Sequence, residues 1–236
     1  MIQISDEVFC DDFLATCEIE NRLLPNPYYP YPYLIIENFF NPQEMATITH
    51  AIQEQQDEVQ AQIKSTLLNS VVVPSIDKEI RKTSLSKLPE CLEEYYRERF
   101  LEHQPMIENF YAMGLTNGTP PQVLSYYAGD FYIKHADDSS ELVDKEGNTV
   151  GFNCVAPERK ITTVLFGTSH ISHDGEGFEG GELLFNYLYD SEGNQVTLCP
   201  KAGDMLVFLS NPFFSHEVKV VKSGYRLTIV QWHNAL

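Results

Sequence analysis

The pattern of hydrophobic and polar positions divides the chain into a helical part and a later part rich in strands. Between residues 41 and 113, many apolar side chains recur three or four positions apart, which is the spacing of an amphipathic helix. From residue 122 onward, apolar residues alternate with polar ones in short runs that Gly and Asn turns separate. The pattern therefore predicts helices that support a following set of sheets.

Two helices are expected in the first part. One begins at residues 41–44, whose sequence Asn-Pro-Gln-Glu offers an N-cap, a proline at the first helical position and a glutamate that can reach back. Its apolar positions continue to about residue 63, and a polar, irregular stretch then follows to about residue 86. The second helix covers residues 88–112, with a bend expected near Pro105.

Eight strands are expected in the second part. Two connections, at residues 146–148 and 192–194, have the same sequence Glu-Gly-Asn between alternating runs, and each is typical of a hairpin turn. The predicted strands lie near residues 122–127, 131–137, 160–167, 181–189, 195–199, 204–209, 215–221 and 225–232.

This order of elements favours a mainly β fold of the α+β class. Eight strands after a helical part are typical of a double-sheet jelly roll, or double-stranded β-helix, with the helices packed on one sheet. A seven-stranded sandwich is the competing fold. We expect residues 1–32 to form a lead-in and residues 33–236 a single domain, with helical support over 41–113 and the jelly-roll core over 122–234.

Composition and charge narrow the functional classes. Hydrophobic residues make up 43% of the 236 residues and charged residues 21%, which suits a folded chain with a substantial core. The net charge of −18 disfavours a nucleic-acid partner, because an acidic surface repels phosphates. The five cysteines form no C-x-x-C pair, which fits a reducing compartment. With no secretory signal and no membrane-spanning run, we expect a cytoplasmic protein without a membrane partner.

A histidine and a carboxylate stand two residues apart after a run of alternating residues. His135 and Asp137 end the stretch from Gln122, and side chains at i and i+2 share one face of a strand that continues through Ala136. Imidazole and carboxylate from one short segment, together with a distant second histidine, form the facial triad that binds non-haem Fe(II) with open positions. The H-x-D pair alone is weak evidence, because it also arises by chance.

His216 is the best candidate for the second histidine. It opens a predicted strand after the turn at residues 210–212, and another strand of the same roll can bring it beside Asp137. The other histidines lie on predicted helices, in a glycine-rich loop or at the C-terminal edge. A buried histidine that only makes structural hydrogen bonds is the alternative for His216.

Arg226 indicates a binding site for an anion. It lies in the apolar run from Tyr225 to Trp232, and burial of an arginine in such a strand is costly unless the side chain meets an anion. A guanidinium pairs with a carboxylate through two parallel hydrogen bonds, and Thr228 shares its face of the strand. A small dicarboxylate could therefore dock on Arg226 and Thr228 and reach the metal with its other end. An ion pair with one of the protein's own acids is the alternative.

Together these residues resemble the Fe(II)- and 2-oxoglutarate-dependent dioxygenases, and within them the prolyl 4-hydroxylase-like branch. The similarity covers roughly residues 33 to 234, beginning with Ile35 to Phe40 and the helix that follows. It includes the motif Y-x-x-G-x-x-Y-x-x-H-x-D, a G-G-E segment that opens a strand, and a G-D pair followed in its strand by a phenylalanine. It also includes the distal histidine, the co-substrate arginine and an aromatic residue at the strand end. The matching residues are Tyr126, Gly129, Tyr132, His135, Asp137, Gly180, Gly181, Glu182, Gly203, Asp204, Phe208, His216, Arg226 and Trp232.

The resemblance implies a ligand set and a co-substrate. His135, Asp137 and His216 would bind Fe(II) as the catalytic residues, and Arg226 would anchor the distal carboxylate of 2-oxoglutarate, with O2 as the oxidant. Many relatives have a lysine in place of Arg226, and both side chains can hold an anion. Because related halogenases lack the carboxylate ligand, Asp137 implies hydroxylation or another oxidation without halide.

The resemblance also implies roles for four further residues. Tyr126 and Thr228 are candidate hydroxyl partners of 2-oxoglutarate, whereas Tyr132 and Trp232 are expected to line the substrate site. In this family, 2-oxoglutarate is converted to succinate and CO2 while a substrate C–H bond is hydroxylated. The branch includes enzymes that act on peptidyl proline and others that act on free amino acids or small natural products, and no feature of the sequence separates them.

Two long connections and one other function stay open at this stage. Residues 138–159 and 168–179 are expected to be loops around the site that could form lids. His170, His173 and Asp174 could suggest a second metal, although a mobile polar lid is favoured. The alternative function is that of a cupin-like sensor that binds a metal or a carboxylate without oxygenase activity. The expected partners are 2-oxoglutarate and a small-molecule or peptide substrate.

Overall fold

The computed structural model describes most of the chain after the lead-in. The described residues are 8–9, 33–54, 59–60, 63–67, 71–75, 81–146, 149–173, 175–190 and 192–236. The lead-in expected over residues 1–32 therefore lies outside the described residues, except for residues 8–9. The ring of Tyr33 stacks on Phe185 of the core, with 5.5 Å between the ring centroids.

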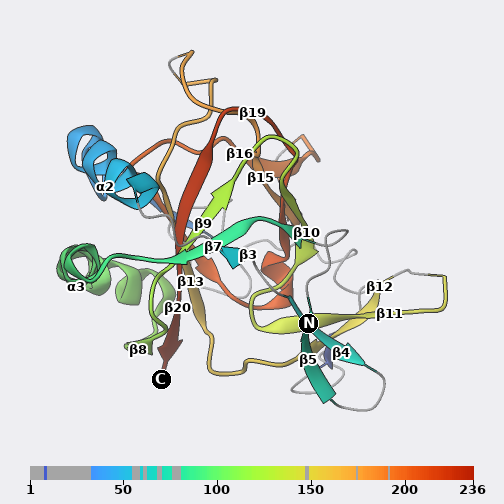
Figure 1. Ribbon diagram of the computed structural model, residues 1–236. Coiled ribbons are helices and arrows are strands. Elements are labelled where there is room, and N and C mark those ends of the chain that lie inside the picture. The colour runs from blue at the N-terminus through green and yellow to red at the C-terminus, as the bar shows by residue number, and fades with distance from the viewer. Residues whose placement is uncertain are drawn as a thin grey trace.

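Two antiparallel sheets build the jelly roll, which confirms the predicted fold class (Figure 1). The larger sheet has the strand order β2-β17-β13-β20-β9-β7-β3, with β8 paired to β20, and the smaller sheet has the order β16-β15-β18-β10-β6. The larger sheet contains β2 (Leu34–Ile36), β3 (Val59–Gln60), β7 (Ser84–Lys87), β8 (Leu115–Gly118), β9 (Gln122–Tyr126), β13 (Ile161–Phe166), β17 (Met205–Leu209) and β20 (Arg226–Ala235). The smaller sheet contains β6 (Arg81–Lys82), β10 (Phe131–His135), β15 (Leu183–Tyr189), β16 (Gln195–Leu198) and β18 (His216–Val218).

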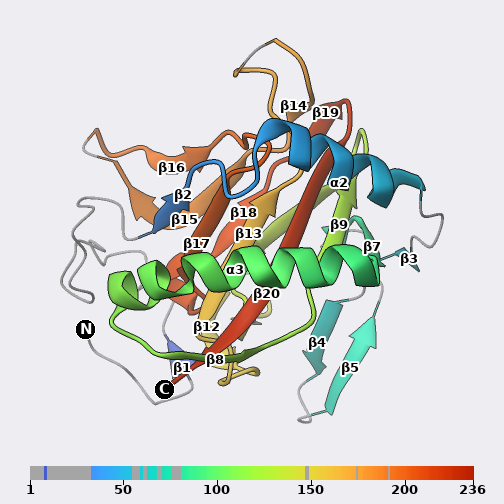
Figure 2. The same ribbon diagram turned by 90° about the vertical axis from the view of Figure 1, so that its left-hand side faces the viewer.

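Two helices cover the outer face of the larger sheet. Figure 2 shows α2 (Pro42–Glu54) and α3 (Glu90–Tyr111) lying across β17, β13, β20 and β9. The hydroxyl of Tyr111 donates a hydrogen bond to the carbonyl of Val207, and Phe100 stacks on His233 of β20 with 4.4 Å between ring centroids. The buried face of α3 continues through Pro105 as one helix and includes Tyr96 and Ile107, as the spacing predicts.

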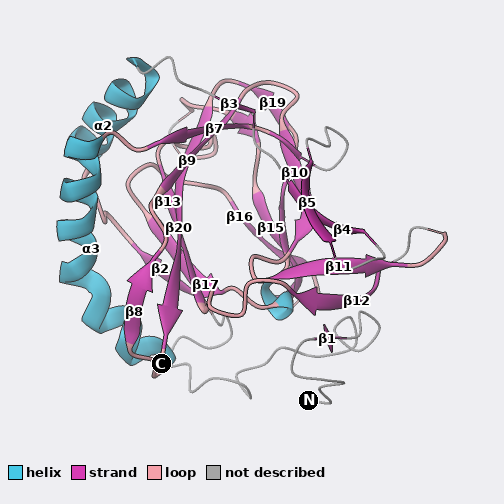
Figure 3. Ribbon diagram, turned by 60° about the horizontal axis from the view of Figure 1, so that its bottom comes forward, coloured by secondary structure: helices cyan, strands magenta, loops and turns pink. Residues whose placement is uncertain are grey.

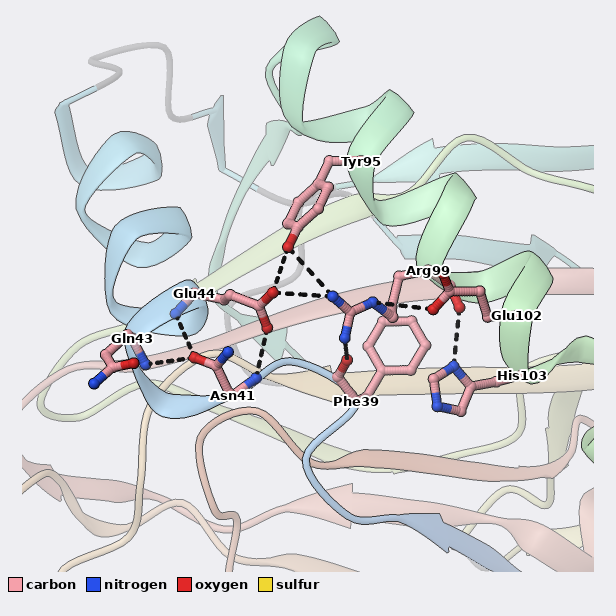
Figure 4. A network of polar contacts seen from close by, with 8 residues as sticks. All are labelled: Phe39, Asn41, Gln43, Glu44, Tyr95, Arg99, Glu102 and His103. Carbon is pink, nitrogen blue, oxygen red and sulfur yellow. Dashed lines mark hydrogen bonds and ion pairs between the residues drawn. The ribbon is translucent and has the colours of Figure 1, made fainter.

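The start of α2 is the capping box that the sequence predicts, and it is connected to α3 (Figure 4). The Asn41 side chain accepts hydrogen bonds from the backbone of Gln43 and Glu44, while Glu44 Oε2 accepts one from the backbone of Asn41 at 2.8 Å. The other carboxylate oxygen of Glu44 accepts hydrogen bonds from Tyr95 and Arg99 of α3. Because one carboxylate serves the cap and both partners, α2 and α3 are held in a fixed relative position on the sheet.

The prediction that the first helix continues to residue 63 is wrong. The helix ends at Glu54, and Val59–Gln60, Ile63–Leu67 and Val71–Ser75 form the strands β3, β4 and β5. Strands β4 and β5 pair with each other, and β6 and β7 follow them. The expected polar, irregular stretch therefore consists largely of strands. A spacing of four between two β-branched residues fits a helix and a strand equally, and the β propensity of the segment decides the outcome.

All eight predicted strands of the second part are present, with shorter or shifted ends. The predicted run 215–221 divides into β18 and β19 (Val221–Ser223), and β19 pairs with β14 (Glu179–Gly180). The expected turn at 192–194 connects β15 and β16. The expected loop at 138–159 is instead mostly a hairpin of β11 (Ser139–Val143) and β12 (Thr149–Cys154), which lies on the opposite side of the barrel from α2 and α3 (Figure 3).

The described part of the chain contains no helix that is both long and apolar enough to cross a membrane.

Strand β1 (Val8–Phe9) pairs with β12, so residues of the expected lead-in contact the hairpin of the core domain.

Candidate functional site

Two histidines face each other across the smaller sheet. His135 is the last residue of β10 and His216 the first of β18, and the two residues are paired across the antiparallel ladder. Their ring centroids lie 4.3 Å apart. A register shift interrupts the ladder between Tyr132 and His135, which changes the direction of the last side chain of β10. Direct pairing of β10 with β18 therefore brings the two histidines together, although they are far apart in the sequence.

Asp137 joins the histidines from beyond the end of β10. The strand does not continue through Ala136 as expected, so strand periodicity does not orient the carboxylate. Instead, the hydroxyl of Thr162 on β13 donates a hydrogen bond to Asp137 Oδ2 at 2.7 Å, and Arg159 donates one to the backbone carbonyl of Asp137 at 2.9 Å. These two bonds fix both the side chain and the main chain of Asp137.

The three side chains fit a divalent metal ion. Their candidate ligand atoms all lie within 4.8 Å of one another, and this is the cluster of potential metal ligands that the described residues contain. Nδ1 of His135 bonds to the carbonyl of Ile133, and Nδ1 of His216 bonds to that of Phe214, at 2.9 and 3.0 Å. Since Nδ1 carries the proton in both bonds, each Nε2 keeps its lone pair for a metal. Thr162 occupies Oδ2 of Asp137, which leaves Oδ1 on the side of His135.

The electrostatics of the cluster favour the protonation states that a metal requires. Burial and, to a lesser extent, the neighbouring His216 lower the pKa of His135 to about 3, so the imidazole is neutral near pH 7. Burial acts to raise the pKa of Asp137, but the nearby His216 and His135 and the hydrogen bond from Thr162 outweigh it and hold the pKa below its usual value. A neutral imidazole at His135 and an ionised carboxylate at Asp137 are the forms in which these groups bind Fe(II).

Arg226 lies buried at the start of β20 and forms no ion pair with any acid of the described residues. Only 1% of it is exposed, its Nε donates a hydrogen bond to the carbonyl of Gly181 at 2.8 Å, and its Cζ lies 4.8 Å from the centre of the Tyr126 ring. Its NH1 has no hydrogen-bond partner among the described residues. Burial lowers the pKa of the guanidinium, although Tyr126 and Glu182 oppose that shift. A buried charged donor without a partner is available to bind an external anion.

The backbone of Gly181 makes room for the arginine. Gly181 has φ +64°, and a Cβ atom there would lie 2.9 Å from Cδ of Arg226. Tyr126 is the cross-strand partner of Arg226 on β9, and Thr228 lies two positions further along β20, fully buried on the same face. The structure therefore brings together the three residues that the sequence suggests for a carboxylate, with the glycine of the G-G-E segment beside them.

Tyr132 and Trp232 lie close to the metal ligands, each against an arginine. The ring of Tyr132 stacks on His135 with 3.6 Å between centroids, and Arg81 Cζ lies 4.5 Å from the Tyr132 ring centre. Arg159 Cζ lies 4.0 Å from the ring centre of Trp232. Trp232 contributes to the low pKa of Asp137, although its Nε1 makes no bond of normal hydrogen-bond geometry.

The sequence reasoning missed Thr162, Arg81 and Arg159. Thr162 lies in the apolar strand β13, where its polar side chain is the one feature that could have marked it. No local sequence pattern marks the two arginines. The G-G-E segment was read as a strand opening, and β15 begins directly after it at Leu183.

The remaining histidines do not join the cluster. His170 lies 3.4 Å from Glu182 Oε1, and His173 bonds to the backbone carbonyl of Cys199. Asp174, the third residue of the suggested second metal site, lies outside the described residues. His233 is buried in β20 and bonds through Nε2 to the hydroxyl of Thr163 at 3.0 Å, as a structural histidine does.

Comparisons with known proteins point to one family. Residues 121–234 match the profile of the 2OG-Fe(II) oxygenase superfamily. No curated protein matches the chain. A prolyl 4-hydroxylase from Pseudomonas putida is 18% identical with a TM-score of 0.59, and the alignment covers 86% of this chain and 92% of that one.

Two further solved structures share the fold. A prolyl hydroxylase from Trichoplax adhaerens, in complex with a hypoxia inducible factor oxygen degradation domain peptide, is 18% identical with a TM-score of 0.58 and coverage of 86% of this chain and 83% of that one. A viral collagen prolyl hydroxylase from Paramecium Bursaria Chlorella virus-1, in its 2OG complex, is 18% identical with a TM-score of 0.55 and coverage of 87% and 97%. At these identities the likeness establishes the fold.

Proposed function

We propose that this chain, whose residues 121–234 belong to the 2OG-Fe(II) oxygenase superfamily, hydroxylates a C–H bond of a prolyl, peptidyl or amino-acid-like substrate. The chain is a 2-oxoglutarate-dependent dioxygenase, and its cofactors are Fe(II), 2-oxoglutarate and O2. The family match favours an oxygenase over a cupin-like sensor without activity. The observation that carries the proposal is the His135, Asp137 and His216 cluster, together with a buried guanidinium on a strand of the same roll whose NH1 has no hydrogen-bond partner among the described residues.

The metal would be held by His135, Asp137 and His216. When bound, Fe(II) activates O2 and, with 2-oxoglutarate as the electron donor, supplies the oxidant for a C–H bond while succinate and CO2 are released. The protein orients its ligands beforehand, since the backbone carbonyls of Ile133 and Phe214 fix the imidazoles. Ligands that are already aligned bind the metal without the entropic cost of ordering them.

The 2-oxoglutarate would dock with its distal carboxylate on Arg226. A guanidinium with an unsatisfied, buried NH1 gains a charge-assisted hydrogen bond from a carboxylate, and burial makes this gain larger than it would be at the surface. Thr228 and Tyr126 are the proposed hydroxyl partners, because they flank Arg226 on β20 and β9. Gly181 contributes by accepting the Nε hydrogen bond, which orients the guanidinium.

The substrate class is proposed from the fold alone. Solved structures with this fold include a hydroxylase bound to a peptide and a collagen prolyl hydroxylase, so a prolyl or peptidyl substrate is a reasonable first choice for this chain. Tyr132 and Trp232 are proposed to line the substrate site, because each lies beside a metal ligand. We also propose a cytoplasmic location, on the pattern of the cysteines, and neither nucleic acid nor a membrane as a partner.

A spectroscopic experiment tests this function. Under anaerobic conditions, Fe(II) and 2-oxoglutarate are added to the protein, and the weak visible charge-transfer band of the chelate is recorded. Air is then admitted and succinate is measured. We expect the band and slow succinate formation in the wild type, and neither in H216A. A wild-type protein that shows no band and no succinate would contradict the proposal, as would full turnover in the variant.

A further inference from the structure

Arg81 lies beside the proposed metal ligands on an edge of the smaller sheet. It is the first residue of β6, where it pairs with Tyr132 of β10, so both side chains are on one face of the sheet. The guanidinium covers the Tyr132 ring at 4.5 Å from its centre, and that ring stacks at 14° on His135. Arg81, Tyr132 and His135 thus form a continuous stack.

Arg159 contacts another of the proposed metal ligands, Asp137. It precedes β13, donates a hydrogen bond from NH1 to the backbone of Asp137, and covers the ring of Trp232 at 4.0 Å. Both arginines also act on Tyr132. Burial raises the pKa of the Tyr132 hydroxyl to about 12, the charges of Arg81 and Arg159 oppose that shift, and Asp137 and Tyr126 add to it. Both guanidinium groups therefore act on the Tyr132 hydroxyl, against the negative charge of Asp137.

Both arginines lack an anionic partner. Within the described ranges, neither guanidinium forms an ion pair, and the Nε atom of each is buried without a hydrogen-bond partner. Other described cations do have acids, for example Arg99 with Glu44 and Lys82 with Asp130. Burial of two arginines to this extent, with no acid paired to either among the described residues, costs solvation free energy that an external anion would restore.

We infer that the primary substrate carries a free carboxylate, which docks between Arg81 and Arg159 with the Tyr132 hydroxyl as a third donor. This inference rests on the proposed function and narrows its substrate class to an amino acid, or to a peptide recognised at its carboxyl terminus. A guanidinium pairs with a planar carboxylate through two parallel hydrogen bonds. Two neighbouring guanidinium groups therefore favour a carboxylate over most other anions. Because Arg81 covers Tyr132, which stacks on His135, and Arg159 bonds to the backbone of Asp137, a carboxylate held by both arginines places the rest of the substrate beside the proposed metal ligands.

The chain contains one tryptophan, and it reports on this site. Trp232 lies under Arg159, so an anion that binds the guanidinium changes the fluorescence of the indole. The full chain is loaded with Fe(II) and 2-oxoglutarate without oxygen and titrated with the twenty protein L-amino acids and their carboxamides. The tripeptide Gly-Gly-Pro and its amide form a second arm, which distinguishes a peptide carboxyl terminus from a free amino acid.

We expect at least one acid to give a saturable fluorescence change and to stimulate succinate release in air. Its carboxamide should bind at least about tenfold more weakly, because hydrogen bonds to a charged group are lost. In R81Q the preference for the acid over the amide should fall by about tenfold or more. The control is R97Q, which removes the same charge from an exposed position on α3 where Arg97 pairs with Glu94, and it should keep the wild-type preference.

Three results would overturn the inference. One is a panel in which no acid binds more tightly than its amide, including a panel without any binding. A second is an unchanged preference in R81Q. The third is a parallel loss of acid and amide binding in R81Q, which would assign Arg81 to the structure of the site. Failure of the proposed function looks different, since the wild type would then give neither the chelate band nor succinate.

Discussion

The hydroxyl of Thr162 lies 2.7 Å from Oδ2 of Asp137, so a strand of the larger sheet orients the carboxylate that follows a strand of the smaller one. Thr162 also bonds to Ser210, beyond the end of β17, at 2.9 Å. The carboxylate is therefore held by a buried chain of hydroxyl groups and not by strand geometry. Such outer contacts set the orientation of a ligand and with it the affinity of the metal.

Replacement of Thr162 by valine should weaken metal binding while the fold is kept. The change removes the hydrogen bond to Asp137 and conserves the shape of the side chain, so the carboxylate becomes free to rotate. We expect the Fe(II) concentration for half-maximal succinate formation to rise about 10- to 100-fold. The measurement is the Fe(II) dependence of 2-oxoglutarate turnover at saturating 2-oxoglutarate.

Thr163→Val is the matched control for this prediction. Thr163 is the next residue of β13, but its hydroxyl bonds to His233 and to the backbone of Gln231 on the opposite face. This variant should lose stability and keep the wild-type Fe(II) dependence. Equal Fe(II) dependence in both variants would contradict the role of Thr162.

Replacement of Arg226 should remove 2-oxoglutarate binding and spare the metal. In R226Q the buried positive charge is lost, and truncation of a charged partner in a buried pair costs about 2–5 kcal/mol, or at least about 30-fold in affinity. R226K keeps the charge without the planar fork and should lose less. Affinity is measured by anaerobic titration of the Fe(II)-loaded protein with 2-oxoglutarate, followed through the chelate band.

Metal affinity supplies the control for the arginine variants. Isothermal titration with Fe(II) alone should give wild-type values for R226Q, because Arg226 makes no contact with the three proposed ligands. Thermal unfolding establishes that each variant is folded. A folded R226Q that binds 2-oxoglutarate as tightly as the wild type would rule out Arg226 as the anchor.

The sequence predicts the contents of the site better than the contacts that assemble it. His135, Asp137 and His216 are recognisable because residue type, spacing and strand position all agree. The pairing of His135 with His216 is a property of sheet register between distant segments, and local pattern carries no information on it. For Asp137 the expectation was right for the wrong reason, since Thr162 and not the strand period directs its side chain.

Errors in the fold have a similar origin. Val59 and Ile63 are four residues apart, which a helix and a strand accommodate equally well, so apolar spacing alone could not end the helix at Glu54. The hairpin of β11 and β12 contains several charged and polar residues, and its pattern is therefore close to that of a loop. The capping box, in contrast, depends only on the four consecutive residues 41–44, and here sequence and structure agree.

Loss of the α2 cap should destabilise the domain without an effect on the site. In N41A the backbone N–H groups of Gln43 and Glu44 lose their acceptor, which costs about 1 kcal/mol. For a chain of this length, that corresponds to a decrease of about 2–4 °C in the unfolding temperature. Q43A is the control, because the Gln43 side chain has no part in the cap. Equal unfolding temperatures for N41A and Q43A would contradict the role of the cap.

The buried His233 should make the domain less stable in mild acid. Burial lowers its pKa to about 4 from an unfolded value near 6.5, so between these two values the unfolded chain binds the proton more readily. The stability that His233 contributes is complete above about pH 6.5 and is lost as the pH falls toward 4. The difference in pKa corresponds to about 3 kcal/mol.

Chemical denaturation at a series of pH values tests this prediction. In H233Q the free energy of unfolding should depend less steeply on pH between 4 and 6.5, because the glutamine does not titrate. Other buried groups keep part of the slope in both proteins, so the comparison isolates the histidine. The control is H50Q, which removes an exposed imidazole from α2 and should keep the wild-type slope. An H233Q slope equal to that of the wild type would contradict the prediction. Protonation of His233 in its place between Phe100 and Thr163 would then cost less than its burial implies.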